Sequence, residues 1–297
     1  MRNTLGLLAG LLCWLPAIAS ADPPAQKLPS ALLVFPFIES QGDRDTRIEI
    51  LNLSGTQQTL QCFYIDGFSC NEVGFLLSLT PYQPVSWLAS SGFSSGFSAV
   101  PPFFGDGELK CAVAPQQPQI EFHNTIQGRA TVFGTDGSTV SLGAVGFQRL
   151  SDGDFTGTVS LDGSTYAQCP DRLHFQVLTD LPTSTSDMII VPCSENLVLQ
   201  QPTTIHLSFT ITNEFETSFS AASVVTCFGR TTLGAIASTL TRAVLGSDTA
   251  HVVVRGGAGP VLGLVIDNVP GAKTAGNEPS FQGGRSATLS FPSVLNP

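Results

Sequence analysis

The stretch TTIHLSFTIT, residues 203–212, decides the expected fold class. Every second residue from Ile205 to Ile211 is apolar, and the residues between them are polar. Successive side chains of an extended chain point to opposite faces, so this order gives one apolar face and one polar face. The stretch therefore predicts a β-strand that buries one side.

The same alternation recurs through the chain, whereas runs with helical periodicity are scarce. The alternating segments are short and are separated by turn signals such as Asp66-Gly67 and Asp162-Gly163. Many short strands of this kind are typical of antiparallel sandwiches or barrels. We therefore expect an all-β protein. Further alternating segments are TRIEILNL, TLQCFYI, VGFLLSL, GELKCAVA, RATVFG, HVVVR and SATLSF. The one segment that resembles a helix, residues 231–246, is rich in β-branched residues.

A faint internal repeat suggests how the strands are grouped. ALLVFPFIES, TRIEILNLS and TLQCFYI in the first half correspond to DMIIVPCSEN, TIHLSFTITN and SVVTCFGR in the second half. Repeats usually mark repeated structural units. The polar, proline-containing segment 181–186 resembles a linker between them. We expect two antiparallel β-sandwich (Ig-like) domains in tandem, residues 31–180 and residues 187–297.

Residues 1–21 have the features of a secretory signal peptide. Arg2 precedes an apolar run that ends at Ile18, and small residues follow before Asp22. The run is shorter than the about 20 apolar residues of a membrane-spanning helix, so a retained anchor is the less favoured alternative. We expect cleavage before Asp22, a linker over residues 22–30, no transmembrane span after cleavage, and a secreted, periplasmic or cell-envelope location.

Charge and composition restrict the partners. The formal net charge is -10, and charged residues make up 12% of the chain, against 42% hydrophobic residues. Phosphate backbones are bound by basic faces, so nucleic acid is not an expected partner. The apolar content is high enough to build a folded core.

Six cysteines follow the expected cleavage site. An even number in an exported chain favours disulfides, and the paired spacing of a zinc site is absent. Six cysteines can pair in many ways, and the sequence does not decide among them. We expect Cys193 to pair with Cys227 because their strands are expected to be neighbours. Cys62 and Cys70 would close a hairpin, which leaves Cys111 to pair with Cys169.

The motifs VFPFIES, NLS, LQCFYI, LTPYQPVSWLASSG, GELKC, VPCSEN, TNEFETSFS and VTCF are spread over most of the chain. Together they resemble a set of exported bacterial proteins to which no activity is assigned. The resemblance implies that the two halves belong together. It implies no substrate and no catalytic residue.

Residues 92–96, GFSSG, match the G-x-S-x-G pattern of a hydrolase nucleophile elbow centred on Ser94. That pattern needs a strand before the serine and a helix after it. Pro101 and Pro102 stop a helix within its first turns. We therefore expect Ser94 to be a loop residue and predict no catalytic residue here.

The same loop is rich in phenylalanine. If the rings were exposed, they would form a contact site for a partner. Large apolar side chains are more often buried, so the favoured interpretation is that the rings cover an open end of the sandwich. The four residues of this possible contact loop are Phe93, Phe97, Phe103 and Phe104.

Other candidate sites have little support in the sequence. Trp87 lies in an alternating strand and is expected in the core rather than on a sugar-binding surface. The segment SDGDFTG, residues 151–157, lacks the last glutamate of a calcium loop and is expected to be a turn. The histidines have no metal-ligand spacing, so we expect no metal and no cofactor. Catalytic carboxylate pairs can be neither identified nor dismissed among Glu49, Glu108, Asp154 and Glu195.

The expected function is that of a non-catalytic structural or adhesive protein whose partner is an unknown protein or envelope component. The alternative is a secreted hydrolase or a glycan-binding module with its site in a cleft between the two domains.

Overall fold

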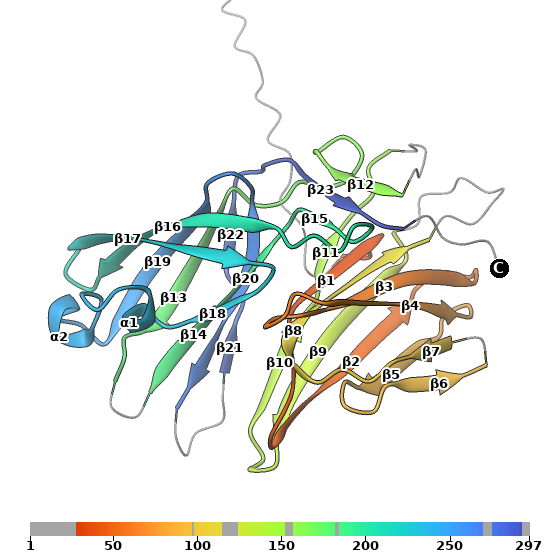
Figure 1. Ribbon diagram of the computed structural model, residues 1–297, viewed down its shortest axis with the longest axis horizontal. Helices are drawn as coiled ribbons and strands as arrows, with labels where there is room; N and C mark the ends of the chain where they lie inside the picture. The colour runs from red at the N-terminus through yellow and green to blue at the C-terminus, as the bar shows by residue number, and fades with distance from the viewer. Residues whose placement is uncertain are drawn as a thin grey trace, which may run out of the picture.

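The computed structural model describes residues 28–96, 98–114, 124–151, 157–181, 184–269 and 275–292. Nearly all regular structure in these residues is β-strand, gathered in sheets of two to five strands (Figure 1). The all-β class is therefore confirmed. The quoted stretch lies in β16 (Thr204–Asn213), whose first eight residues alternate between exposed and buried. The expected signal peptide lies outside the described residues.

Two sheets from the first half of the chain enclose one core, which we call the first core. The first five-stranded sheet has the order β11-β1-β8-β3-β4, and the first four-stranded sheet has the order β10-β9-β2-β5. Both sheets are antiparallel. Leu33, Tyr64 and Ile48 come from the two sheets and meet in the first core. The bounds are β1 (Leu32–Ser40), β2 (Arg44–Asn52), β3 (Gln58–Asp66), β4 (Glu72–Leu79), β5 (Pro84–Leu88), β8 (Gly105–Val113), β9 (Ile126–Gly134), β10 (Thr139–Gly143) and β11 (Val145–Phe147).

Two further sheets enclose a second core. The second five-stranded sheet has the order β17-β16-β19-β13-β22, and the second four-stranded sheet has the order β18-β14-β20-β21. Phe175, Ile190 and Phe209 belong to the second core. The remaining bounds of these sheets are β13 (Arg172–Leu178), β14 (Thr185–Pro192), β17 (Ser218–Thr226), β18 (Gly229–Thr231), β19 (Thr249–Gly256), β20 (Val261–Asn268), β21 (Ala275–Asn277) and β22 (Ser280–Gln282).

Two small sheets complete the strands. A three-stranded sheet has the order β12-β23-β15, with a parallel pair between β15 and β23. A two-stranded hairpin joins β6 to β7. Their bounds are β6 (Phe93–Ser95), β7 (Ser98–Val100), β12 (Thr158–Leu161), β15 (Glu195–Asn196) and β23 (Ala287–Ser290).

The segment 231–246 forms two one-turn helices rather than one helix, α1 (Leu233–Ile236) and α2 (Arg242–Leu245). Thr232 caps α1, and Gly246 ends α2 with a left-handed φ of 69°. In the part of the chain that the structure describes, no helix has both the length and the apolar character needed to cross a bilayer.

A central core lies between the two groups of sheets. In β1, Leu33 points into the first core and Leu32 points into the central core. In β14, Ile190 points into the second core and Ile189 points into the central core. Strands that are buried on both faces have nearly continuous apolar sequences. This double burial explains why the segments around β1 and β14 lack the alternation of β16.

The expectation of two Ig-like sandwiches in tandem is wrong. The immunoglobulin arrangement has about seven strands in two sheets, whereas the described residues form six sheets, four of them with five or four strands in other orders. The two groups are also not separate units, because they share the central core and because the three-stranded sheet joins strands from both halves. The physical reason is that the second face of the first five-stranded sheet also carries many apolar side chains, such as Leu32, Phe63 and Phe147, so this face must be covered as well.

The division of the chain differs from the expected boundary near residues 181–186. β13 precedes this boundary but pairs with β19 and β22, and Thr185 and Ser186 already belong to β14. The proposed repeat fails at its third segment. β3 pairs with β4 and β8, whereas its expected counterpart β17 pairs with β16.

Candidate functional site

All six cysteines after residue 21 form disulfides, as the sequence predicted, but the expected connectivity is wrong. β8 lies between β1 and β3, which places Cys111 directly opposite Cys62 in the sheet. Long-range strand order of this kind leaves no local signal in the sequence. The pairs are Cys62–Cys111, Cys70–Cys227 and Cys169–Cys193.

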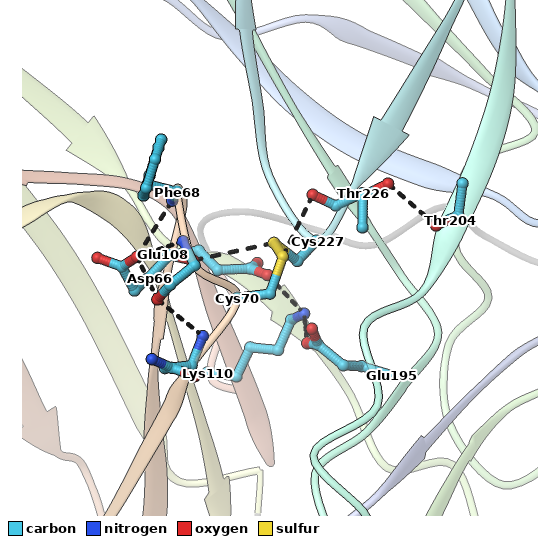
Figure 2. The surroundings of a disulfide bond; sticks show 11 residues. Asp66, Phe68, Cys70, Glu108, Lys110, Glu195, Thr204, Thr226 and Cys227 are labelled. Carbon is cyan, nitrogen blue, oxygen red and sulfur yellow. Dashed lines mark hydrogen bonds and ion pairs between the residues drawn. A yellow bond between two sulfur atoms is a disulfide. The ribbon is translucent and has the colours of Figure 1, made fainter.

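The Cys70–Cys227 disulfide joins the two groups of sheets (Figure 2). Cys70 lies between β3 and β4, Cys227 follows β17, and their Cα atoms are 5.9 Å apart at a sequence separation of 157. Both residues have a left-handed backbone, with φ of 58° at Cys70 and 53° at Cys227. An L residue with a side chain adopts this conformation at a cost of about 1–2 kcal/mol. Backbone strain is therefore present at both ends of this bond.

The turn that carries Cys70 is firmly held. Asp66 Oδ1 accepts a hydrogen bond from the backbone N–H of Phe68 at 3.2 Å, and the Asp66 carbonyl accepts one from the N–H of Cys70 at 2.8 Å. A Cβ at Gly67 would lie 2.5 Å from the Phe228 ring, so only glycine fits there. The turn leaves Phe68 99% exposed and brings Cys70 to the protein surface.

A buried ionic cluster lies near this disulfide (Figure 2). Lys110 in β8 forms ion pairs with Glu108 on the same strand, at 2.9 Å, and with Glu195 in β15. These three side chains are at most 1% exposed. Glu108 and Lys110 are two residues apart in a strand and share the face opposite Leu109, which points into the first core. Lys110 therefore links the first five-stranded sheet to the three-stranded sheet.

The cluster contains more carboxylates than cations. The pKa of Glu72 is raised to about 7, mainly by burial and further by Glu195, against the opposing effect of Lys110. Burial also raises the pKa of Glu108 to about 8, against the opposing effect of Lys110. Burial alone would lower the pKa of Lys110, but Glu108 and Glu195 raise it above its ordinary value. One oxygen of each of the three glutamates has no hydrogen-bond partner among the described residues. The raised pKa values of Glu72 and Glu108 predict that these two groups titrate near neutral pH.

A second ion network crosses the same junction. Arg230 in β18 donates hydrogen bonds to Asp106 at 2.8 Å, to Glu39 at 3.2 Å and to Asp187 at 2.8 Å. Its guanidinium carbon lies 5.5 Å from the ring centroid of Phe37. One arginine of the second group thus holds carboxylates from β1, β8 and β14 together.

Apolar side chains close the junction between these charges. The rings of Phe37 and Phe228 stack with centroids 6.4 Å apart. Ile65 from β3 and Ile189 from β14 lie in the same core with no exposed surface. The carboxylates of the ionic cluster are therefore out of reach of a substrate in this conformation.

The phenylalanine loop divides into buried and exposed residues. Phe103 is 6% exposed and its ring lies 5.1 Å from that of Tyr64, while Phe93 packs partly buried against the first core. Phe104 is 66% exposed, and Phe97 lies outside the described residues. Among the three described rings, the favoured expectation of rings folded onto the core therefore holds for Phe103 and partly for Phe93, whereas Phe104 fits the exposed alternative.

Two other residues that the sequence analysis singled out, Ser94 and Trp87, lie in surroundings that explain them by structure rather than by catalysis or binding. Ser94 lies in the β6–β7 hairpin, which is followed by strand and not by the helix of a nucleophile elbow. Trp87 is 4% exposed, as expected, and its indole N–H donates to the Tyr64 hydroxyl at 2.6 Å. Burial raises the pKa of Tyr64.

Of the four carboxylates that the sequence left undecided, the structure brings two together. Glu108 and Glu195 meet at Lys110, whereas Glu49 forms an exposed ion pair with Arg129. Asp154 and the calcium-like segment lie outside the described residues, apart from its ends. The sequence feature that could have pointed to this cluster is the alternation of Glu108 and Lys110 with apolar neighbours. That alternation, however, predicted that the two charged side chains face solvent.

Two histidines that are distant in sequence also meet. His174 Nδ1 in β13 lies 3.2 Å from His251 Nε2 in β19, and His174 Nε2 lies 3.0 Å from the Gln282 side-chain oxygen. Burial and the neighbouring His174 lower the pKa of His251. Within the described ranges, no three side chains of histidine, cysteine, aspartate or glutamate gather as a metal site would require.

Comparison with known proteins assigns no family. No protein-family model and no curated protein matches the chain. Among solved structures, the PBSX exported protein XepA is similar at 8% sequence identity over 77% of this chain and 83% of that chain, with a TM-score of 0.16. A score this low carries no argument about fold or function. The site is therefore interpreted from its own geometry.

Proposed function

We propose that the protein is a non-catalytic structural or adhesive component that is secreted, periplasmic or part of a cell envelope. The observation that carries the proposal is the closed junction, where a disulfide, two ion networks and a shared core hold both groups of sheets together. A rigid body suits a protein that bears or transmits contacts. Three disulfides favour an oxidising compartment.

A hydrolase or a glycan-binding module with its site between the two groups is less well supported. The ionic cluster is the strongest concentration of carboxylates at the junction, and its side chains are buried. Acid–base catalysis needs a carboxyl group within hydrogen-bonding reach of the substrate. No feature of the described junction offers that access.

Among the described phenylalanines of the predicted contact loop, Phe104 is the most exposed and can meet a partner. It lines a shallow hollow of about 420 Å³ together with Arg44, Asp45 and Phe133. Exposed aromatic rings beside hollows are typical of protein contact sites. We therefore assign the adhesive contact to the surface around Phe104.

The test is a pelleting assay with purified, oxidised protein and washed bacterial envelopes. We expect saturable binding that Phe104→Ser weakens at least about tenfold. Phe215→Ser is the matched control, because Phe215 is 70% exposed on the turn between β16 and β17. Absence of saturable binding, or equal losses in both variants, would count against the adhesive surface. The same preparations are assayed on chromogenic esters and glycosides, and turnover by the purified protein would overturn the non-catalytic assignment.

A further inference from the structure

We propose that the Cys70–Cys227 disulfide is a modification site for external thiols, at which thiol–disulfide exchange unlocks the junction while the other two disulfides stay closed. The proposal does not depend on the adhesive role. It is carried by the partial exposure of Cys70, by the backbone conformation of both cysteines and by the charged groups beneath the bond.

Exposure distinguishes the three disulfides. Cys62, Cys111 and Cys169 have no exposed surface, and Cys193 is 2% exposed. Cys227 is also fully buried, whereas Cys70 is partly exposed on its turn. Exchange requires a thiolate to approach one sulfur of the bond. Among the six cysteines, the reachable residue is therefore Cys70.

Backbone conformation favours the same bond. Of the six cysteines, those with a positive φ are Cys70 and Cys227. Residues with side chains keep this conformation when the surrounding structure imposes it, and strain of this kind is concentrated at functional and switch regions. Cleavage allows both residues to relax. Strained or exposed disulfides are the more easily reduced ones.

The groups beneath the bond give cleavage a consequence. Glu72 lies two residues after Cys70, and the Glu108–Lys110–Glu195 cluster lies close by (Figure 2). One oxygen of each of these glutamates lacks a hydrogen-bond partner among the described residues, and hydration supplies such partners. Release of the Cys70 turn thus opens a route for water to the buried charges. We infer that reduction loosens the junction.

The exchange step is balanced with a thiol as the reductant. A thiolate attacks Cys70 Sγ, the bond between the two cysteine sulfurs breaks, and its electron pair stays on Cys227 Sγ, which takes up a proton. A second thiol then attacks the external sulfur of the mixed disulfide and releases Cys70 as a thiol. The two external thiols leave joined as a disulfide. The two electrons that they give up reduce the Cys70–Cys227 disulfide to two thiols.

The experiment uses the folded, oxidised full chain in glutathione or dithiothreitol without denaturant. Samples are quenched with acid, alkylated and analysed by peptide mass spectrometry, at a constant thiolate concentration. We expect Cys70 and Cys227 to be labelled at least about tenfold faster than the other four cysteines. Simultaneous reduction of all three disulfides, or earlier reduction of Cys62–Cys111 or Cys169–Cys193, would overturn the proposal.

A second measurement tests the unlocking. Protein reduced and alkylated at Cys70 and Cys227 is compared with oxidised protein by hydrogen–deuterium exchange. We expect faster exchange over residues 66–76 and 105–113, with no change in β2 and β9. Unchanged exchange in the first two segments would show that the bond does not lock the junction. The Cys70→Ser/Cys227→Ser variant is the control: it should lack the fast thiol reaction and show the same faster exchange without reductant.

Discussion

Lys110 in β8 and Glu195 in β15 form a buried ion pair at a sequence separation of 85 residues. A buried charge is costly when it is unpaired, whereas a buried pair often adds little net stability over apolar side chains. Separating the two charges while they stay buried is costly, so the pair favours the arrangement in which these two surfaces meet. Glu195 belongs to the three-stranded sheet, so the pair aligns that sheet with the first five-stranded sheet.

Replacing Lys110 leaves two buried glutamates without their cation. We expect Lys110→Met to lower the free energy of unfolding by about 3–5 kcal/mol, measured by denaturant titration of oxidised protein near pH 8. The control is Arg242→Met, which removes a pair with Asp248 whose side chains are 52% and 57% exposed. That change should cost less than about 1 kcal/mol. Equal losses in the two variants would contradict the role of Lys110.

The raised pKa values of Glu72 and Glu108 predict a pH dependence. Their values of about 7 and about 8 lie above the ordinary 4.5 because of burial. At these two positions the folded protein therefore holds more protons than the unfolded chain between about pH 4.5 and pH 8, and their contribution to the free energy of unfolding falls as the pH rises through this range. The stabilising contribution is complete below about pH 4.5 and is lost as the pH passes the raised values.

The measurement for these two groups is denaturant unfolding across that pH range. The Glu72→Gln/Glu108→Gln variant should show a flatter profile than the original protein. Glu49→Gln is the control, because the hydrogen bond from Arg129 lowers the pKa of Glu49 and its side chain is partly exposed. An unchanged slope in the double variant would be inconsistent with titration in the cluster.

The hydrogen bond between Trp87 and Tyr64 predicts a loss of stability when the acceptor is removed. Tyr64→Phe leaves the buried indole N–H without its 2.6 Å partner, which should cost about 1–3 kcal/mol in thermal or denaturant unfolding. Tyr82→Phe changes a residue that is 67% exposed and should have almost no effect. If the Tyr64→Phe variant were as stable as the original protein, the indole N–H of Trp87 would have found another acceptor.

The adjacent residues Phe103 and Phe104 should differ strongly in how much stability is lost when each ring is removed. Phe103→Ala removes a ring that packs on Tyr64 and should cost about 3–5 kcal/mol of unfolding free energy. Phe104→Ala changes a ring that is 66% exposed and should stay within about 0.5 kcal/mol. Comparable losses would mean that Phe104 also packs against the protein.

Local sequence pattern was sufficient for part of the fold. The alternation of residues 203–212 predicted β16, the even cysteine number predicted disulfides, and the strand context of Trp87 predicted its burial. Each of these properties depends on neighbours in sequence or on composition, which a single chain displays directly.

The central core and the ionic cluster depend on long-range packing. Leu32 and Leu33 point into different cores, and nothing in an apolar run indicates how many sheets will cover it. Glu108 and Lys110 alternate with Leu109 and Cys111, which is the pattern of a half-exposed strand. Their face is buried because the second group of sheets covers it. The disulfide connectivity follows from the same stacking.

The three-stranded sheet also sets the order in which the fold can be completed. β23 pairs with β12 and β15, and Phe291, directly after it, is 2% exposed with its ring 5.9 Å from that of Phe63. A chain that is made from its N-terminus cannot finish the central core before residues 287–291 emerge. Part of the apolar face of the first strands therefore stays uncovered until residues 287–291 have emerged, a period in which a nascent chain is prone to aggregation.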